Sequence, residues 1–190
     1  MRLGTLLFVL ALLVPGLALA DDVREVRGVE LPLKVTVNDT ELALNGAGVR
    51  TRFFVRVYVG ALYTTESVED GETAINMDSP RRIHLAMLRD VGRDTMLEAL
   101  ADGLENAMTS EEWDEHSDHI EAFKDLFPGD FKEGYRGDID VIPGEGLIVR
   151  MNDDELGRID DDEFARFVLA IWLGDEPADS GVKAGMLGDD

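Results

Sequence analysis

Two histidines at helical spacing are the first side chains in this sequence that could bind a ligand. His116 and His119 lie three residues apart in a segment with a helical pattern, and Glu112 and Glu115 lie close to them. Two imidazoles and a carboxylate that meet on one helix face could coordinate a transition-metal ion. An exposed polar face of an acidic protein explains the same residues, and the sequence contains no H-E-x-x-H pattern. We therefore expect no metal site here and no cofactor elsewhere.

Residues 152–163 partly match the calcium-binding loop of an EF-hand. Oxygen-bearing side chains or glycine occupy loop positions 1, 3, 6, 9 and 12. Position 5 is Leu156, which offers no side-chain oxygen, and residues 145–151 have a strand pattern where an EF-hand has a helix. A hairpin turn followed by the N-cap of a helix explains the same residues, so we do not expect a specific calcium site.

An arginine and a tyrosine in the most strand-like part of the chain could hold an anion. Arg56 and Tyr58 are two residues apart within 49–63, where β-branched and aromatic residues dominate. Side chains at that spacing share one strand face and lie about 7 Å apart. Arg50 lies eight residues before Tyr58, which is about 26 Å along a continuous strand. Arg50 and Tyr58 can therefore meet at one ligand only if the chain bends or reverses near residues 51–53.

The alternation in this segment also predicts which strand face is buried. The residues that alternate with Arg56 and Tyr58 are more uniformly apolar, so we expect them to face the main core. They are Phe53, Val55, Val57, Val59 and Ala61. A plainer interpretation of the polar residues also stands, in which Arg50 pairs with a surface acid and Tyr58 is an aromatic residue at the edge of the core.

In the rest of the chain, strand-like segments flank a helical middle. The glycines in residues 45–48 predict a turn. Strand patterns cover parts of 23–37 and residues 41–44, 81–91, 135–142, 147–151 and 156–159. Helical patterns cover residues 66–76, 93–108, about 111–127, a segment that begins at the acidic cap 160–162 and ends at 173, and about 181–187. This order predicts an α+β fold in which helices cover a largely antiparallel sheet.

The first residues have the pattern of an export signal. Residues 1–20 combine Arg2, an apolar run over 6–14 and an A-x-A sequence at 18–20. We expect residues 21–190 to form one domain of an exported protein, periplasmic where the cell has an outer membrane. No later stretch is long and apolar enough for a membrane anchor.

The composition is strongly acidic and lacks cysteine. The 190 residues include 18 Lys plus Arg and 40 Asp plus Glu, which gives a formal net charge of −22. This charge argues against nucleic acid and anionic membrane surfaces as partners, because both would repel the protein. The absence of cysteine from the sequence excludes disulfides, thiol catalysis and cysteine-ligated metal sites.

Four short segments combine into the pattern of a known family. They read L-N-G-A-G-V-R at 44–50, V-Y-V-G-A-L-Y at 57–63, I-W-L-G-D-E-P at 171–177 and M-L-G at 186–188. Together they resemble the chalcone isomerase-like proteins, and specifically their exported bacterial branch. The resemblance implies a curved antiparallel sheet, a helical layer on one face and a cleft between them. Plant members close a flavanone ring, whereas non-catalytic relatives hold a fatty-acid carboxylate with an arginine and a tyrosine.

The resemblance also assigns roles to individual residues. Arg50 matches the arginine of the family, and Tyr58 stands where the isomerases have a threonine, which resembles the fatty-acid binders. Trp113, Ile120 and Ile171 stand where the isomerases have tyrosine, asparagine and threonine. Isoleucine has no donor for the oxyanions that an isomerase must stabilise. Of the polar set of the isomerases, only the arginine remains.

These matches lead us to expect an exported, non-catalytic protein that binds a small apolar carboxylate such as a fatty acid. Arg50 would pair with the carboxylate and Tyr58 would hydrogen-bond to it, with Arg56 as the substitute cation and Trp113 and Trp172 as further ligand contacts. Two alternatives stay open. One is an isomerase or lyase that acts on a non-flavonoid substrate, and the other is an envelope protein that binds protein partners and no small ligand.

Overall fold

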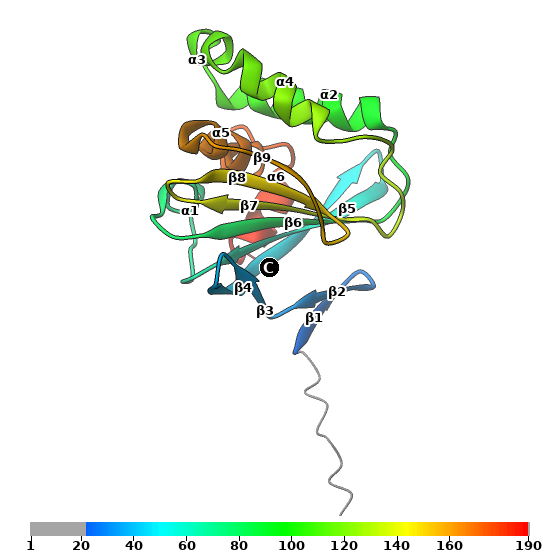
Figure 1. The fold of residues 1–190 in the computed structure, drawn as a ribbon. Coiled ribbons are helices and arrows are strands. Elements are labelled where there is room, and N and C mark those ends of the chain that lie inside the picture. The colour runs from blue at the N-terminus through cyan, green and yellow to red at the C-terminus, as the bar shows by residue number, and fades with distance from the viewer. Residues whose placement is uncertain (1–21, 190) are drawn as a thin grey trace, which may run out of the picture.

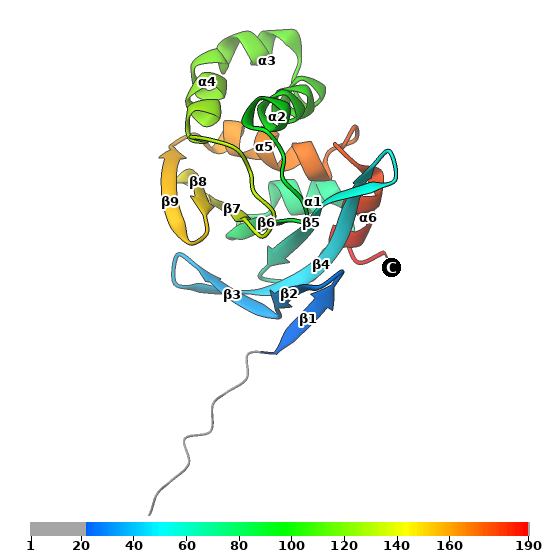
Figure 2. The ribbon, with the colours of Figure 1, turned by 90° about the vertical axis from the view of Figure 1, so that its right-hand side faces the viewer.

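A curled antiparallel sheet is the central element of the fold. The computed structural model describes residues 22–189, and the export signal predicted in residues 1–20 lies outside them. Within the described residues, seven antiparallel strands pair in chain order from β3 to β9. They are β3 (Lys34–Val37), β4 (Thr40–Arg52), β5 (Val55–Thr64), β6 (Arg81–Met87), β7 (Arg136–Ile142), β8 (Gly146–Met151) and β9 (Asp154–Ile159). The curvature visible in Figures 1 and 2 and the α+β class agree with the expected fold.

Helices cover one face of this sheet and enclose the main core (Figure 1). They are α1 (Gly71–Asn76), α2 (Arg93–Ala107), α3 (Ser110–Glu115), α4 (Ser117–Asp125), α5 (Asp162–Leu173) and α6 (Ser180–Met186). α5 packs beneath α2, while α6 packs on β4 and β5. No helix among residues 22–189 is both long and apolar enough to cross a lipid bilayer.

The opposite face of the sheet carries a second, smaller core. A separate hairpin of β1 (Val23–Val26) and β2 (Val29–Pro32) contributes Leu31 to it, and β5 contributes Val59, Ala61 and Tyr63. Strand β5 is therefore buried on both of its faces for most of its length.

The predicted burial direction is correct for Val57, which packs on the main core, but wrong for most of this strand. Tyr58 and Leu62 face the main core, whereas Val59 and Ala61 face the smaller one, and Phe53 is exposed to solvent. A strand that is covered on both faces needs apolar residues at every position, so its alternation does not indicate which face meets the helices.

The helical middle is divided where the sequence predicts one helix. α2 agrees with the pattern over residues 93–108, but residues 111–127 form two helices, α3 and α4, separated at His116. Thr109 caps α3 as its sequence position suggests, because its hydroxyl accepts from the backbone of Glu112 and the Glu112 carboxylate accepts from the backbone of Thr109.

Residues 152–163 form a turn, a strand and a helix cap. Asn152 and Asp153 occupy the β8–β9 turn with φ of 50° and 74°, and β9 follows them. Asp161 then caps α5 by accepting a hydrogen bond of 2.6 Å from the backbone of Phe164. This is the arrangement that we expected in place of an EF-hand loop.

The glycine turn predicted at residues 45–48 is wrong, because β4 is continuous through this segment. The pairing of β4 with β5 shifts register at Asn45, which bulges out of the ladder. The Asn45 side chain exchanges hydrogen bonds of 2.9 Å with the backbone of Val68 and donates one of 2.8 Å to the carbonyl oxygen of Met186. The bulge thus ties β4 to the loop after β5 and to the end of α6.

The glycines of this motif permit close backbone packing. A Cβ atom on Gly48 would lie 2.7 Å from the Cα of Val182, and one on Gly185 would lie 2.5 Å from the carbonyl oxygen of Ala47. Real Cβ atoms do not come this close to backbone atoms, so α6 can lie directly on β4 only because these positions lack side chains.

Gly48→Ala should lower the free energy of unfolding by about 2 kcal/mol, because the added methyl meets backbone that cannot rotate away. Gly137→Ala on β7 is the matched control, since a Cβ there has no neighbour nearer than 4.0 Å. Its effect should stay within about 0.5 kcal/mol. Urea unfolding measures both variants, and equal stabilities would contradict the close-packing role.

A buried network of charges crosses β6, β7 and β8. Arg82 contacts Asp140 with 2.7 Å between Nη2 and Oδ2, and His84 contacts Asp138 with 2.6 Å between Nδ1 and Oδ1. Arg150 adds a contact of 3.3 Å to Asp140 from the next strand. The sheet register produces these pairs, because Arg82 lies opposite Asp140 and His84 lies opposite Asp138.

Asp138 links this network to the pH dependence of stability. Burial by itself would raise the pKa of Asp138, but the hydrogen bond and charge of His84, together with Arg82, hold this pKa below its ordinary value. The ionised carboxylate therefore stabilises the fold above about pH 4, and the stabilisation is lost as the pH falls through the lowered value.

Asp138→Asn should lower the free energy of unfolding at neutral pH by about 3 kcal/mol, because it leaves the buried His84 and Arg82 without their shared partner. The difference from the unaltered protein should shrink as the pH falls below about 4, where the native carboxylate also becomes neutral. Urea unfolding over a pH series measures this difference. A loss that does not change with pH would show that Asp138 acts through packing alone.

Candidate ligand-binding site

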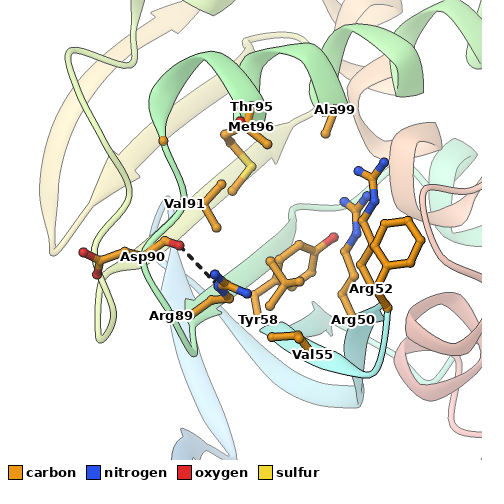
Figure 3. A pocket seen from close by; sticks show the side chains of 13 residues that line it. Arg50, Arg52, Val55, Tyr58, Arg89, Asp90, Val91, Thr95, Met96 and Ala99 are labelled. Atoms are coloured by element: carbon orange, nitrogen blue, oxygen red, sulfur yellow. Dashed lines mark hydrogen bonds between the residues drawn. The ribbon is translucent and has the colours of Figure 1, made fainter.

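The β4–β5 hairpin brings the expected arginine and tyrosine together. The chain reverses at Phe53 and Phe54, whose φ values are 49° and 64°, and Arg50 and Tyr58 lie directly opposite each other on the paired strands. The Arg50 guanidinium carbon lies 5.7 Å from the centroid of the Tyr58 ring, and the tyrosine hydroxyl points toward the guanidinium (Figure 3). The reversal that a shared ligand requires is therefore present.

Trp172 orients the hydroxyl of Tyr58. The Trp172 Nε1–H on α5 donates a hydrogen bond of 3.0 Å to the Tyr58 oxygen, and both side chains are 2% exposed. Indole nitrogen can only donate, so the hydroxyl proton of Tyr58 remains available for an acceptor in a ligand. Burial raises the pKa of Tyr58 against the opposing effects of Arg50 and Trp172. The phenol is therefore neutral at physiological pH and acts as a hydrogen-bond donor.

A cavity of about 360 Å³ opens beside this pair. The β4–β5 hairpin, the segment after β6 and the first turns of α2 form its walls (Figure 3). Val55, Val57, Val91, Met96 and Ala99 supply apolar surface, and the polar lining includes Arg50, Tyr58 and Thr95. An apolar wall with a few convergent polar groups is the usual form of a small-molecule site.

A second space borders the cavity at Met96 and lies closer to the core. A smaller space of about 30 Å³ also has Met96 in its wall, and its lining is almost entirely apolar, with Leu100, Phe127, Phe131 and Trp172 among the residues. A methionine side chain has several rotatable bonds and adapts easily to a neighbour. Met96 separates the cavity at Arg50 from the smaller apolar space in the main core.

Positive charge dominates the mouth of the cavity. Arg50, Arg52 and Arg89 all line it, and among residues 22–189 none of the three forms a salt bridge with a carboxylate. Asp90 also lies at the mouth, but its carboxylate accepts from the backbone of Glu133 over 2.9 Å and contacts Lys132 at 3.4 Å. In a chain with 40 acidic residues, this local excess of cations favours an anionic ligand.

The other predicted site residues lie elsewhere. Arg56 borders a separate open depression together with Phe54 and Leu88, so it does not replace Arg50 in the cavity. Trp113 on α3 packs at the edge of the main core and does not line the cavity. Trp172 acts through Tyr58 and through the deeper space.

Sequence reasoning missed several residues that line the cavity, namely Arg52, Arg89, Val91, Thr95 and Ala99. Arg52 could have been found, because residues close to a hairpin reversal share the surroundings of Arg50. Arg89 lies within the predicted strand 81–91 but just beyond the end of β6 at Met87, and nothing in the sequence marks it as a site residue. Ile120 and Ile171, which stand where the isomerases have polar residues, are buried in the main core.

The structure also adds a partner to the histidine pair. His116 is 4% exposed, so the exposed polar face that we expected is wrong at this position. Asp161, at the start of α5, joins the pair, and ligand atoms of His116, His119 and Asp161 lie within 4.8 Å of one another. These residues could hold a metal ion, at a location separate from the cavity.

Comparisons with known proteins agree with the fold described above. A solved fatty-acid binding protein of Arabidopsis thaliana is 16% identical and superposes with a TM-score of 0.66 over 84% of this chain and 92% of its own. A search of curated proteins found no match. A family model described as chalcone isomerase-like matches residues 23–188, which include every strand and helix described above. The chain therefore belongs to the chalcone isomerase-like family.

Proposed function

We propose that this protein is an exported, non-catalytic binding protein for a small apolar carboxylate such as a fatty acid. The observation that carries the proposal is the position of Arg50 and Tyr58 together at the mouth of an apolar cavity. A cation and a neutral phenol recognise one carboxylate, and the apolar walls receive a hydrocarbon chain. The similar fold of a plant fatty-acid binding protein supports this choice of ligand.

The geometry suggests how the ligand lies. One carboxylate oxygen accepts from the Arg50 guanidinium and the other from the Tyr58 hydroxyl, which Trp172 holds in place. The hydrocarbon chain then extends along Val57 and Val91 toward Met96, and longer chains pass Met96 into the deeper apolar space.

Binding fits this site better than isomerisation does. An isomerase needs several donors around the oxygens on which negative charge develops. Here Tyr58, Thr95 and the arginines are the side-chain donors among the residues that line the cavity, and the deeper space beyond Met96 is lined mainly by apolar residues such as Leu100, Phe127 and Phe131. Burial raises the pKa of Tyr58, so the phenol stays neutral at physiological pH and can donate its proton in a hydrogen bond to a carboxylate that Arg50 holds by charge.

Arg50→Ala should weaken palmitate binding about 30-fold, because it removes a charge-assisted hydrogen bond worth about 2 kcal/mol. Tyr58→Phe should weaken it about 5-fold, because a neutral hydrogen bond contributes about 1 kcal/mol. Isothermal titration calorimetry with palmitate below its aggregation concentration measures both effects. Arg56→Ala is the matched control, since Arg56 lies on the same hairpin but outside the cavity, and it should leave the affinity unchanged.

Methyl palmitate gives a second control within the same experiment. The ester has no negative charge, so the unaltered protein should bind it weakly and Arg50→Ala should not weaken it further. Thermal unfolding of each variant shows that the fold is intact. Equal losses in Arg50→Ala and Arg56→Ala, or no palmitate binding by the unaltered protein, would overturn the proposal.

A further inference from the structure

We propose that His116, His119 and Asp161 bind a divalent transition-metal ion such as Zn²⁺, with Glu163 as a fourth ligand. His116 Nε2 lies 3.9 Å from Asp161 Oδ1 and 3.9 Å from Glu163 Oε2, and His119 Nδ1 lies 3.9 Å from Asp161 Oδ2. Tetrahedral zinc with bonds of about 2.0–2.2 Å places its ligand atoms about 3.3–3.5 Å apart. His119 and Glu163 are partly exposed and can close the remaining gap by side-chain rotation.

The surroundings of His116 prepare it to bind a metal. Its Nδ1 lies 3.0 Å from the backbone carbonyl oxygen of Glu112. A carbonyl oxygen only accepts, so Nδ1 carries the proton and Nε2 presents its lone pair to Asp161 and Glu163. Phe164 and Phe167 pack on the ring and fix its orientation. A backbone partner on the second ring nitrogen is the usual outer contact of a metal-bound histidine.

An unpartnered nitrogen of His119 supports the metal site independently of the distances between the ligand atoms. Its Nδ1 is buried and has no hydrogen-bond partner, although it faces Asp161. A buried polar atom without a partner is unfavourable, and native structures contain few of them. A metal ion between His119 and Asp161 would supply the missing partner.

The site would connect two parts of the helical layer. His116 and His119 belong to the α3–α4 segment, whereas Asp161 caps α5. α3 and α4 make few contacts with the remaining elements, so a shared metal ion would hold this segment onto α5. Binding of the metal should therefore raise the thermal stability of the whole chain.

Calorimetry of the metal-free protein with ZnCl₂ tests this proposal. We expect one zinc ion per chain and a rise in the unfolding temperature, and Co²⁺ in place of zinc should give visible absorption bands of a four-coordinate site. His119→Ala and Asp161→Asn should each weaken zinc binding more than 10-fold. Asparagine retains the N-cap of α5, so Asp161→Asn tests the carboxylate without loss of the helix cap.

The control for this experiment is Glu115→Gln, which removes an exposed acid from α3 and should leave zinc affinity unchanged. Calcium should not compete at equal concentration, because imidazole nitrogen is a poor ligand for it. No zinc binding, or equal weakening by Glu115→Gln and His119→Ala, would overturn the assignment, since the second result describes general attraction to an acidic surface.

Independently, we infer that the tip of the β4–β5 hairpin inserts into an anionic lipid membrane. Phe53 and Phe54 are 85% and 102% exposed, and Val55 is 41% exposed. The hairpin tip projects beyond the sheet (Figure 2). Both phenylalanines have positive φ, and asparagine and glycine are the usual residues at such turn positions. The turn therefore carries two bulky apolar rings at a backbone conformation that disfavours them.

The charges around the tip select the partner. Arg52 lies with its guanidinium carbon 5.7 Å from the Phe53 ring centroid. Arg27, Arg56 and Arg89 border the depression next to Phe54, where they outnumber the two acids that also line it, Asp90 and Glu133. The net charge of −22 argues against anionic membranes as partners of the whole surface, but these four arginines lie around this one tip. Basic residues around exposed aromatic rings are the pattern of a surface that binds anionic lipid. The rest of the acidic surface would then face away from the membrane.

The shape of the tip also favours lipid over a protein partner. Three apolar residues on a projecting turn offer far less than the roughly 800 Å² per partner of a stable protein interface. A fluid bilayer needs no complementary pocket and accepts a narrow apolar wedge. Phe53 and Val55 also line the mouth of the ligand cavity, so docking would place that mouth at the membrane surface. A fatty acid could then pass from the membrane into the cavity, and this step rests on the proposed function. The docking of the tip does not rest on it.

Co-sedimentation with vesicles tests the membrane inference. We expect binding to vesicles of phosphatidylglycerol and phosphatidylcholine, little binding to phosphatidylcholine alone, and loss of binding in high salt. The double substitution F53N with F54G should reduce binding more than 10-fold and should not destabilise the protein, because it installs the residues that this turn prefers. Leu33→Asn is the matched control, since Leu33 is 40% exposed at another position, and it should bind vesicles normally.

Failure of this inference and failure of the proposed function give different results. Calorimetry with palmitate in the absence of vesicles reports on the cavity of the unaltered protein, and co-sedimentation reports on the tip. Vesicle binding that F53N with F54G leaves unchanged would overturn the inference. Self-association that this variant abolishes, without any vesicle binding, would also overturn it and identify a second copy of the chain as the partner of the tip.

Discussion

The register between β4 and β5 is the constraint on which the functional surface depends. A reversal of only two residues at Phe53 and Phe54 places Arg50 opposite Tyr58 and sends both strands back along the sheet. A shift of one residue would turn Tyr58 away from Trp172 and toward the smaller core. The bulge at Asn45 and the contact of Gly48 with α6 secure this register from the other end of β4. The meeting of Arg50 with Tyr58 and the projecting tip are therefore two consequences of one strand pairing.

The cavity mouth is positively charged, whereas the protein as a whole is negatively charged. The chain carries a net charge of −22, yet Arg50, Arg52 and Arg89 gather at one cavity mouth. The acidic remainder favours solubility and repels anions at long range. Over the few ångströms at which a ligand is held, nearby arginines dominate because salt screens the more distant charges. Net charge is thus a weak guide to the ligand of an individual site.

The sequence predicts the class of the fold and most of its elements, because glycines, prolines and capping residues mark their ends. The segments 93–108 and 81–91, for example, contain α2 and β6. It does not predict the division of residues 49–63 into two strands, since the reversal at Phe53 and Phe54 has no glycine or asparagine. It also does not predict that Asp161 meets His116, because that contact depends on how α5 packs against α4. The family resemblance identified Arg50 and Tyr58, and the strand pairing explains how they meet.

The close packing of α6 on β4 has a consequence for the order of folding. The hydrogen bond from Asn45 to Met186 spans 141 residues, and Gly48 contacts Val182 over a similar separation. This part of β4 stays uncovered until α6 is available, because α6 lies more than 130 residues further along the chain. Contacts between such distant segments form slowly, since a long loop must close before they are made. The cavity wall that includes β4 is therefore completed late. Until α6 has packed, this face of β4 is exposed to solvent and accessible to chaperones.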